Sequence, residues 1–244
     1  MRRNHAKLWG VAANERNGDH PRQPGAGRET AMSAADLLPY AQVVRDCYEP
    51  NSVPTWQDVD KLTHVYQVLM NGTDHFNFQG TLDPAEWINR DFDAIGLESF
   101  EHPLFGLVHD GFARGALAMV PHIISELQRI GRKAFTIGGH SKGAGEAQVA
   151  AAELKRLGYP PAAVYLFEPP RAGTATLKSY LSDIPVFATQ TFNAEGADLV
   201  TEVPGWPWEN VTPLSRLQVP DSDDIATKHK IPAVISALQA ASQG

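Results

Sequence analysis

Several features that define common protein classes are scarce in this sequence. Its 244 residues hold one cysteine, Cys47, so no disulfide can close within the chain, and we interpret Cys47 as a small buried apolar residue. No apolar run approaches the roughly 18 residues that a membrane span requires. The formal net charge of −7 provides no basic surface for nucleic acid. These absences exclude an intrachain disulfide framework, argue against nucleic-acid binding and predict no integral membrane association.

The N-terminal segment also lacks the apolar periodicity of a folded element. Residues 1–31 are rich in Arg, Asn, Pro and Gly, so we expect a disordered extension, with Met32 as the true start and residues 32–244 as a single domain. Basic residues open the chain as in a signal peptide, but the apolar stretch at residues 8–13 is too short for one. We therefore expect no export signal and a cytoplasmic location by default, with release by another route left open.

From residue 34 onwards, periodic patterns indicate a folded α/β domain. Strand and helix patterns alternate between residues 133 and 192, which is typical of a parallel sheet with helices on its faces. Two extended runs meet at Asn71 and Gly72, a dipeptide that favours an antiparallel hairpin. Further helices are expected at residues 34–47, after Asp83, at about 113–130, at 174–181 and from about 231, whereas 54–62, 95–107 and most of the chain after 192 are expected to be irregular.

Residues 139–143 carry the most informative motif. They read Gly-His-Ser-Lys-Gly and match G-x-S-x-G, between an apolar run of strand type and an alanine-rich helix. In that setting the motif builds a sharp turn that exposes the serine hydroxyl, and the glycines provide the room that the turn needs. A phosphate-binding loop fits less well, because the stretch contains no G-K-S/T. We interpret Ser141 as a catalytic nucleophile.

A serine nucleophile needs a base and an acid. In enzymes with a G-x-S-x-G nucleophile turn, the acid and then the histidine follow the serine along the chain. Only His229 of the nine histidines comes after Ser141, and it lies in what we expect to be a polar loop before a helix. His140 must point away from the serine hydroxyl, so we assign it to packing or orientation. For the acid the residues alone leave several alternatives open: Asp198, Glu195, Glu202, Asp183 and Glu168.

Five motifs, in order, resemble those of the class 3 lipase family, which contains the fungal-type triacylglycerol lipases and their bacterial relatives. They cover most of residues 63–235. Residues 78–81 are similar to F-R-G-S/T, 108–112 match V-H-x-G-F, 139–143 match G-H-S-x-G, 167–173 resemble F-G-x-P-R-x-G, and 198–204 resemble D-x-V-P-x-x-P.

This resemblance implies an α/β-hydrolase fold, a mostly parallel sheet flanked by helices with an antiparallel N-terminal hairpin. It implies a serine carboxylic-ester hydrolase, a lipase or esterase, that forms an acyl-enzyme intermediate. It also implies that Ser141 is the nucleophile, Asp198 the acid and His229 the base, with Thr81 and the backbone N–H of Lys142 forming the oxyanion hole. The substrate would be a small-molecule or lipid ester.

The chain departs from the family motifs at several positions. Gln79 stands for the usual arginine, Lys142 for leucine, Ala144 for the second glycine, Glu168 for glycine and Thr201 for proline. None of these changes removes a catalytic group. The residue after the nucleophile often lies near the bound acyl group, so Lys142 leads us to hypothesise a preference for short or polar acyl esters.

Other functions with the same triad remain as alternatives, namely a phospholipase, a thioesterase or an acyltransferase. A catalytically silent hydrolase fold that serves as a binding module is an alternative of another class. We expect no metal and no cofactor, because His102, His109 and Asp110 lack convincing ligand spacing.

Two further segments are open to more than one interpretation. Residues 86–107 read as a helix and a packed loop rather than a lid. Trp206 and Trp208 either line an alcohol or acyl site or pack the acid-bearing loop.

Overall fold

A computed structural model describes residues 32–60, 62–81, 99–131 and 134–243. The expected N-terminal extension, and the helix expected after Asp83, lie outside these residues. In chain order the described elements are α1 (Ala34–Cys47), β1 (Trp56–Gln57), β2 (His64–Met70), β3 (Thr73–Phe78), β4 (Ser99–His102), β5 (Gly106–His109), α3 (Asp110–Arg129), β6 (Phe135–His140), α4 (Lys142–Arg156), β7 (Ala163–Phe167), β8 (Gly173–Thr174), α5 (Ala175–Tyr180), β9 (Val186–Asn193), β10 (Gly196–Ala197), η1 (Leu199–Glu202), β11 (Trp208–Glu209), β12 (Ser215–Gln218), α6 (Ile225–His229) and α7 (Ile231–Ala241).

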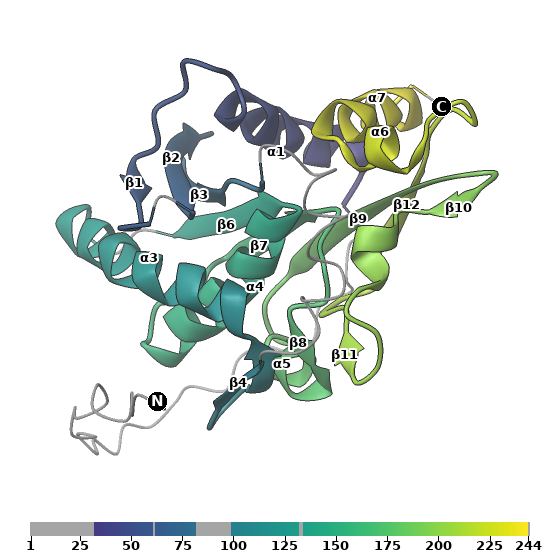
Figure 1. Ribbon diagram of the computed structural model, residues 1–244. Coiled ribbons are helices and arrows are strands. Elements are labelled where there is room, and N and C mark those ends of the chain that lie inside the picture. The colour runs from purple at the N-terminus through teal and green to yellow at the C-terminus, as the bar shows by residue number, and fades with distance from the viewer. Residues whose placement is uncertain (1–31, 61, 82–98, 132–133, 244) are drawn as a thin grey trace. The chain divides into compact units, whose positions relative to one another are not determined.

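A mixed sheet of eight strands forms the centre of the described domain (Figure 1). Its order is β1-β2-β3-β6-β7-β9-β10, with β12 also paired to β9. Strands β3, β6, β7, β9 and β12 run parallel to their neighbours in this group, whereas the β2–β3 hairpin is antiparallel. The hairpin turn has φ +49° at Asn71 and +81° at Gly72, as its Asn-Gly sequence predicts. The predicted parallel sheet with an antiparallel hairpin is confirmed.

Helices cover both faces of this sheet. Helices α3 and α4 pack over one face on a core that includes Phe76, Ile137 and Leu154, whereas α1 and α7 pack over the other on a core that includes Tyr165 and Val234 (Figure 1). Strand β6 is buried along its whole length because both of its faces are covered. The domain therefore has the three layers of an α/β fold.

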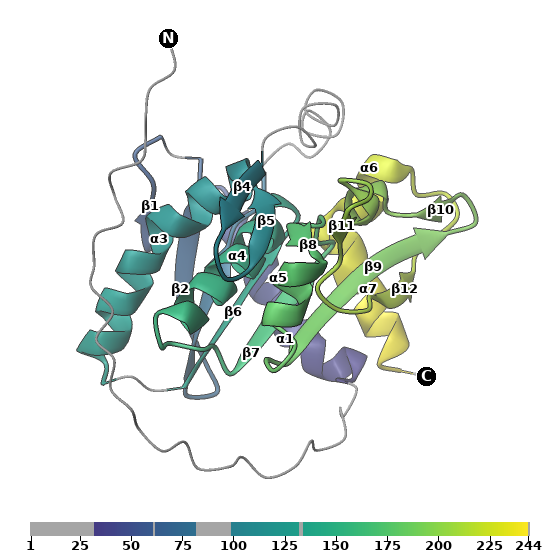
Figure 2. The ribbon, with the colours of Figure 1, turned by 90° about the horizontal axis from the view of Figure 1, so that it is seen from below.

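A small second sheet lies beside α5. Its order is β11-β8-β5-β4, and Figure 2 shows these short strands gathered together. The expectation that residues 95–107 are irregular was wrong for its described part, because β4 and β5 form an antiparallel hairpin. The polar connection at residues 54–62 likewise contains β1. Each of these strands has two to four residues, too few to produce a readable alternation.

Candidate active site

Ser141 lies at the turn between β6 and α4, in a backbone conformation that side chains rarely adopt. Its φ is +55° and its ψ is −129°. The flanking glycines make this turn possible, because a Cβ at Gly139 would collide with the carbonyl of Gly143, and one at Gly143 would collide with the carbonyl of Phe78. The strained turn that the motif predicts is present, and the Ser141 hydroxyl lies 2.8 Å from a ring nitrogen of His229.

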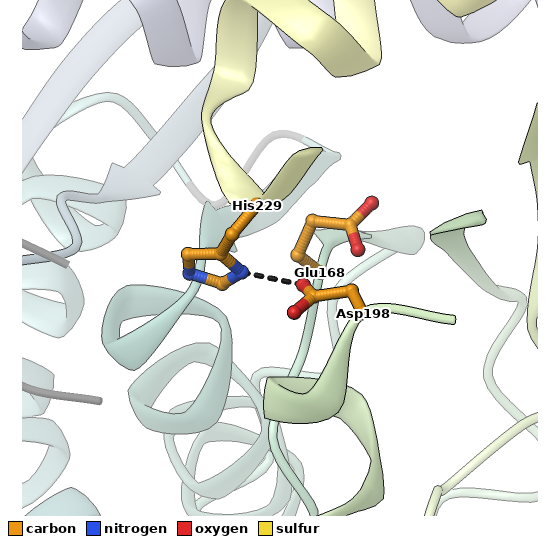
Figure 3. Close-up of side chains that lie close together, drawn as sticks. All are labelled: Glu168, Asp198 and His229. Atoms are coloured by element: carbon orange, nitrogen blue, oxygen red, sulfur yellow. Dashed lines mark hydrogen bonds and ion pairs between the residues drawn. The ribbon is translucent and has the colours of Figure 1, made fainter. Parts of the chain in front are cut away.

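The structure brings Ser141, His229 and Asp198 into one hydrogen-bonded chain. His229 Nε2 lies 2.8 Å from Ser141 Oγ. Figure 3 shows the second contact of this chain, in which His229 Nδ1 lies 2.5 Å from Asp198 Oδ2. All three residues are fully buried. Because the Asp198 carboxylate can only accept, Nδ1 carries the proton and Nε2 is free to accept the proton of Ser141.

Other acids that the sequence left open are engaged elsewhere. Glu202 binds Arg171 with a 2.6 Å ion pair, and Asp183 pairs with Lys155 at 2.5 Å. Residues of η1 and β9 hold Asp198 in place: its Oδ1 accepts from the N–H of Val200 at 3.1 Å, and its own N–H donates to the carbonyl of Thr191 at 2.9 Å. Asp198 is thus fixed as the N-cap of η1.

His229 is the last residue of α6, so the expectation of a polar loop there was wrong. Asp224 caps this short helix by accepting from the N–H of Thr227 at 2.7 Å. Lys230 then separates α6 from α7, which begins at Ile231 as predicted. The helix was missed because its five residues show no apolar stripe, although the Asp224 cap is a readable signal.

His140, which precedes the nucleophile, contacts the backbone of His229. Its Nε2 lies 2.8 Å from the His229 carbonyl oxygen, and its Nδ1 lies 2.9 Å from the hydroxyl of Tyr48. A carbonyl oxygen only accepts, so Nε2 carries the proton and Nδ1 accepts from Tyr48. Burial, and next the charge of His229, lower the pKa of His140 to about 3, which keeps it neutral. The expected orienting contact is present, and the part played by Tyr48 was not foreseen.

The end of β3 lies against the nucleophile turn. Strands β3 and β6 run parallel with Phe78 opposite Gly139, so the segment after Phe78 passes beside Ser141. A Cβ at Gly80 would lie 3.2 Å from Ser141 Cβ and would collide with the carbonyl of His140. Thr81 follows directly, and the N–H of Lys142 opens α4 on the other side of the serine. Both sequence-predicted oxyanion donors are therefore on segments that adjoin Ser141.

The side chain of Lys142 extends along α4 toward Glu146, one turn further along the helix. Its ammonium forms an ion pair with the carboxylate of Glu146 and donates to the carbonyl of Leu62 at 2.9 Å. Glu146 is fully buried and also accepts from the hydroxyl of Thr63 at 2.8 Å. Burial raises the pKa of Glu146, and the charge of Lys142 opposes that rise. The i,i+4 spacing of Lys142 and Glu146 is the sequence signal that could have identified this pair.

A second acid, Glu168, lies beside the pair that Asp198 and His229 form (Figure 3). Burial, and then the charge of Asp198, raise the pKa of Glu168 well above its ordinary value. Burial alone would also raise the pKa of Asp198, but the charge and hydrogen bond of His229, with contributions from Glu168 and Val200, hold it below its ordinary value. The pKa values of the two acids are thus shifted in opposite directions, upward for Glu168 and downward for Asp198.

These three residues are also the cluster that comes nearest to a metal site in the described part of the chain. Internal hydrogen bonds already engage Asp198 and His229, with His229 Nδ1 2.5 Å from Asp198 Oδ2. Among the ligand candidates from the sequence, His102 lies 3.8 Å from Glu153, and Asp110 forms an ion pair with Arg114 at 2.5 Å. In this cluster His229 donates a proton to a hydrogen bond and Asp198 accepts it, which is an arrangement typical of a proton-transfer site.

A strained serine above a parallel sheet, bonded to a histidine and a buried aspartate, defines the α/β-hydrolase class of serine hydrolases. Comparisons with known proteins agree. The family model described as Lipase (class 3) matches residues 75–208, more than half of the chain. The protein therefore belongs to the class 3 lipase family and is a carboxylic-ester hydrolase of lipase type.

Solved fungal lipases have similar folds. A mutant form of MDLA from Penicillium cyclopium is 19% identical with a TM-score of 0.61, and the match covers 80% of this chain and 83% of that one. The Rhizomucor miehei triacylglyceride lipase is 16% identical, with a TM-score of 0.60 and coverage of 76% and 79%. Lipase II from Rhizopus niveus is 18% identical, with a TM-score of 0.61 and coverage of 80% and 82%. No curated protein sequence matches the chain.

Helices in the described part of the chain are all too short or too polar to cross a membrane.

Proposed function

We propose that Ser141 is the nucleophile, His229 the general base and Asp198 the residue that orients His229 in a lipase or esterase reaction on a lipid ester. The unbroken chain of contacts, 2.8 Å from Ser141 Oγ to His229 and 2.5 Å from His229 to Asp198, is the observation that carries this proposal. It also weighs against a silent binding module, because nothing in such a module would require a buried serine to face an imidazole.

The reaction follows from this arrangement. His229 Nε2 takes the Ser141 proton as Oγ attacks the ester carbonyl, and the resulting imidazolium is stabilised by ionised Asp198. His229 then returns the proton to the leaving alcohol, which produces an acyl-enzyme. Water, activated by the same histidine, releases the acid and regenerates Ser141. The low pKa of Asp198 keeps it charged throughout.

The backbone N–H groups of Thr81 and Lys142 are proposed as the oxyanion hole. Support comes from their positions, since one follows Gly80 at the end of the strand that packs on Ser141, and the other begins α4. Each such donor is worth about 3–4 kcal/mol of barrier in comparable enzymes.

A preference for short or polar acyl esters remains a hypothesis, and its test must respect the ion pair that Lys142 forms. Replacing Lys142 alone would leave the buried carboxylate of Glu146 without its cation. The informative comparison is therefore Lys142→Met combined with Glu146→Gln, assayed on esters of graded acyl length. An activity profile across acyl lengths that is identical to that of the wild type would contradict the hypothesis.

We also propose that residues 32–244 act as one catalytic domain.

The triad is tested by steady-state hydrolysis of chromogenic esters by Ser141→Ala, Asp198→Asn and His229→Gln. We expect Asp198→Asn to lower kcat by about four orders of magnitude, because an amide favours the wrong tautomer of His229. The other two changes should reduce the rate at least as far. Asp183→Asn, at an exposed acid that was also a candidate, serves as the matched control and should retain full activity. Activity of Asp198→Asn near that of the control would refute the assignment.

A further inference from the structure

Glu168 is a buried carboxyl group that the triad mechanism does not use (Figure 3). One of its oxygens, one carboxyl oxygen of Asp198 and one ring nitrogen of His229 all lie within 4.8 Å of one another. Two carboxylates this close, away from water and beside a single imidazole, cannot both be ionised, because like charges repel strongly in such surroundings. One of the two acids must hold a proton.

Their hydrogen bonds decide which acid that is. Asp198 accepts from His229 Nδ1 at 2.5 Å and from the N–H of Val200 at 3.1 Å, both donors that favour a carboxylate. Among the described residues, Glu168 accepts from a single backbone N–H, that of Thr191, which lies 3.0 Å and 3.1 Å from its two carboxyl oxygens. The Thr191 hydroxyl lies 3.4 Å from Glu168 Oε2, but its one proton is donated to the carbonyl of Lys228. Burial and the charge of Asp198 raise the pKa of Glu168, in agreement with this assignment.

Thr191 connects the segments that carry these groups. Its N–H donates to Glu168, its carbonyl accepts from the N–H of Asp198 at 2.9 Å, and its hydroxyl donates at 2.8 Å to the carbonyl of Lys228, the neighbour of His229. A single residue of β9 therefore fixes the relative positions of β7, the Asp198 loop and α6. Glu168 is part of the framework that orients the triad, and the N–H of Thr191 aligns the Glu168 carboxyl group.

The backbone at Glu168 supports a specific use of this side chain. Its φ is +49°, a conformation that costs a non-glycine residue free energy. Glycine, the residue usual at this position of the family motif, would adopt it without strain. A carboxyl group at a strained and fully buried position calls for a compensating interaction, and a carboxyl oxygen of Asp198 lies within 4.8 Å to provide one.

We propose that Glu168 is a positioning residue of the ester hydrolysis: it carries a proton at neutral pH and donates a hydrogen bond to the Asp198 carboxylate, which fixes that carboxylate against His229. This inference rests on the proposed triad and extends it to a fourth residue. Donation to Asp198 draws charge from its carboxylate, which then stabilises the protonated imidazolium form of His229 less strongly. The enzyme should therefore stay active to lower pH than it would without Glu168.

Within the described part of the chain, the other titratable groups named here do not offer Glu168 a cation. The ammonium of Lys228 in α6 binds Asn193 Oδ1 at 3.2 Å and the carbonyl of Gly196 at 3.1 Å. His140, at the end of β6, is held neutral by its burial. Glu202 in η1 is bound to Arg171. The charge balance at Glu168 is therefore set by Asp198 and His229.

Two substitutions separate a neutral donor from an ionised or merely space-filling side chain. Gln has the shape of a protonated Glu, so in Glu168→Gln the amide oxygen can accept from Thr191 while the NH₂ donates to Asp198. We expect kcat within about threefold of wild type. Glu168→Leu fills the space without a donor, and we expect kcat to fall about tenfold or more with KM nearly unchanged. Glu209→Leu, at a half-buried acid in β11, is the matched control.

The pH profile of kcat/KM supplies a readout that a structural role would not change. Loss of the donor in Glu168→Leu should move the acidic limb to higher pH, whereas Glu168→Gln should leave it in place. An acidic limb that moves to lower pH in Glu168→Gln would show that Glu168 is ionised and would overturn the proposal. So would a loss of activity in Glu168→Gln as large as that in Glu168→Leu, or a Glu168→Leu variant with wild-type kcat and profile.

Rates are normalised to the fraction of protein labelled by a serine-reactive fluorophosphonate, so misfolded material does not count. A wild type that is not labelled would refute the triad itself, which distinguishes that failure from a failure of the role of Glu168. If Glu168→Leu does not fold, an infrared difference spectrum of wild type minus Glu168→Gln at neutral pH decides the matter. A protonated-carboxyl C=O band that is lost in the variant supports the proposal, and its absence overturns it.

Discussion

Tyr48 shows how a residue outside the motifs supports the nucleophile. Its hydroxyl donates to His140 Nδ1 at 2.9 Å, and His140 in turn donates to the carbonyl of His229 at 2.8 Å. The Tyr48 oxygen also packs against Gly80, which adjoins Ser141 Cβ. Burial raises the pKa of Tyr48, so the hydroxyl stays protonated as a donor. The side chain of Tyr48, at the C-terminal end of α1, thus links the end of β3, the nucleophile turn and His229.

We predict that Tyr48→Phe lowers kcat by about 5- to 30-fold with little change in KM, because Nδ1 of His140 would lose its buried donor at a cost of about 1–2 kcal/mol. Steady-state kinetics on a chromogenic ester measures the effect. Tyr159→Phe removes a hydroxyl that accepts from Gln128 at 2.9 Å near the surface, and serves as the control. Equal rates for the two variants would show that the Tyr48 contact is dispensable.

Single residues of the site differed in how far the sequence could predict them. Ser141 and His229 followed from local rules, a turn that needs glycines and a histidine that must follow the serine. Asp198 could not be chosen among several acids without the family motifs, because the choice depends on which loop reaches His229 in space. Tyr48 and Thr191 carry no local signal, since their contacts join segments up to 92 residues apart.

At the scale of elements, close packing of α3 on α4 shapes the region beneath the nucleophile. Gly115 and Gly145 let the two helices approach, because a Cβ at Gly145 would lie 2.9 Å from ring carbons of Phe112. A Cβ at Gly115 would overlap both the carboxylate of Glu146 and the hydroxyl of Thr63. The buried ion pair of Glu146 with Lys142 therefore depends on a missing side chain in the neighbouring helix.

Gly115→Ala should destabilise the fold by about 1–3 kcal/mol, despite the better helix propensity of alanine, because the added methyl group forces apart groups that cannot move freely. Urea denaturation followed by circular dichroism measures the change. Gly205→Ala is the control, since a Cβ at Gly205 meets nothing within 4 Å, and it should stay within about 0.5 kcal/mol of wild type. A Gly115→Ala variant as stable as this control would mean that the helices are less tightly packed than described.

Elements with a strong local pattern were predicted correctly, and several strands of two to four residues were not. Helix α3, with 20 residues, and the buried strand β7 followed from periodicity and apolar content. Strand β12 has four residues with one buried position, and pairs in parallel with β9 after a long connection. Its pairing is set by the whole sheet and not by its own sequence. The same holds for β4, β5 and β8 in the small sheet.

At the scale of the whole molecule, burial lowers the pKa of several interior histidines. One of them, His75, lies away from the triad. It is fully buried in β3, its Nδ1 lies 2.9 Å from Thr136 Oγ1, and burial lowers its pKa from 6.5 to about 3. In the unfolded chain His75 takes up a proton below pH 6.5, whereas in the folded protein it does not until about pH 3. Its contribution to stability is therefore present above pH 6.5 and is lost as the pH falls below that value.

Comparing wild type with His75→Gln isolates this effect from all other titrating groups. We expect the difference in unfolding free energy, wild type minus variant, to shrink by about 2 kcal/mol between pH 7.5 and pH 5, because only the wild type loses stability through this residue. Urea titrations of both proteins at several pH values provide the measurement. A difference that does not change with pH would mean that His75 can bind a proton in the folded state.

Ser141 as an activated nucleophile is the central claim, and the intact mass of the protein after exposure to a fluorophosphonate tests it most directly. The account predicts a single adduct on the wild type and none on Ser141→Ala, because only a serine with an adjacent base and oxyanion donors reacts readily with such a reagent. A folded wild type that stays unmodified after prolonged exposure in the presence of lipid micelles, or an adduct that persists in Ser141→Ala, would contradict it.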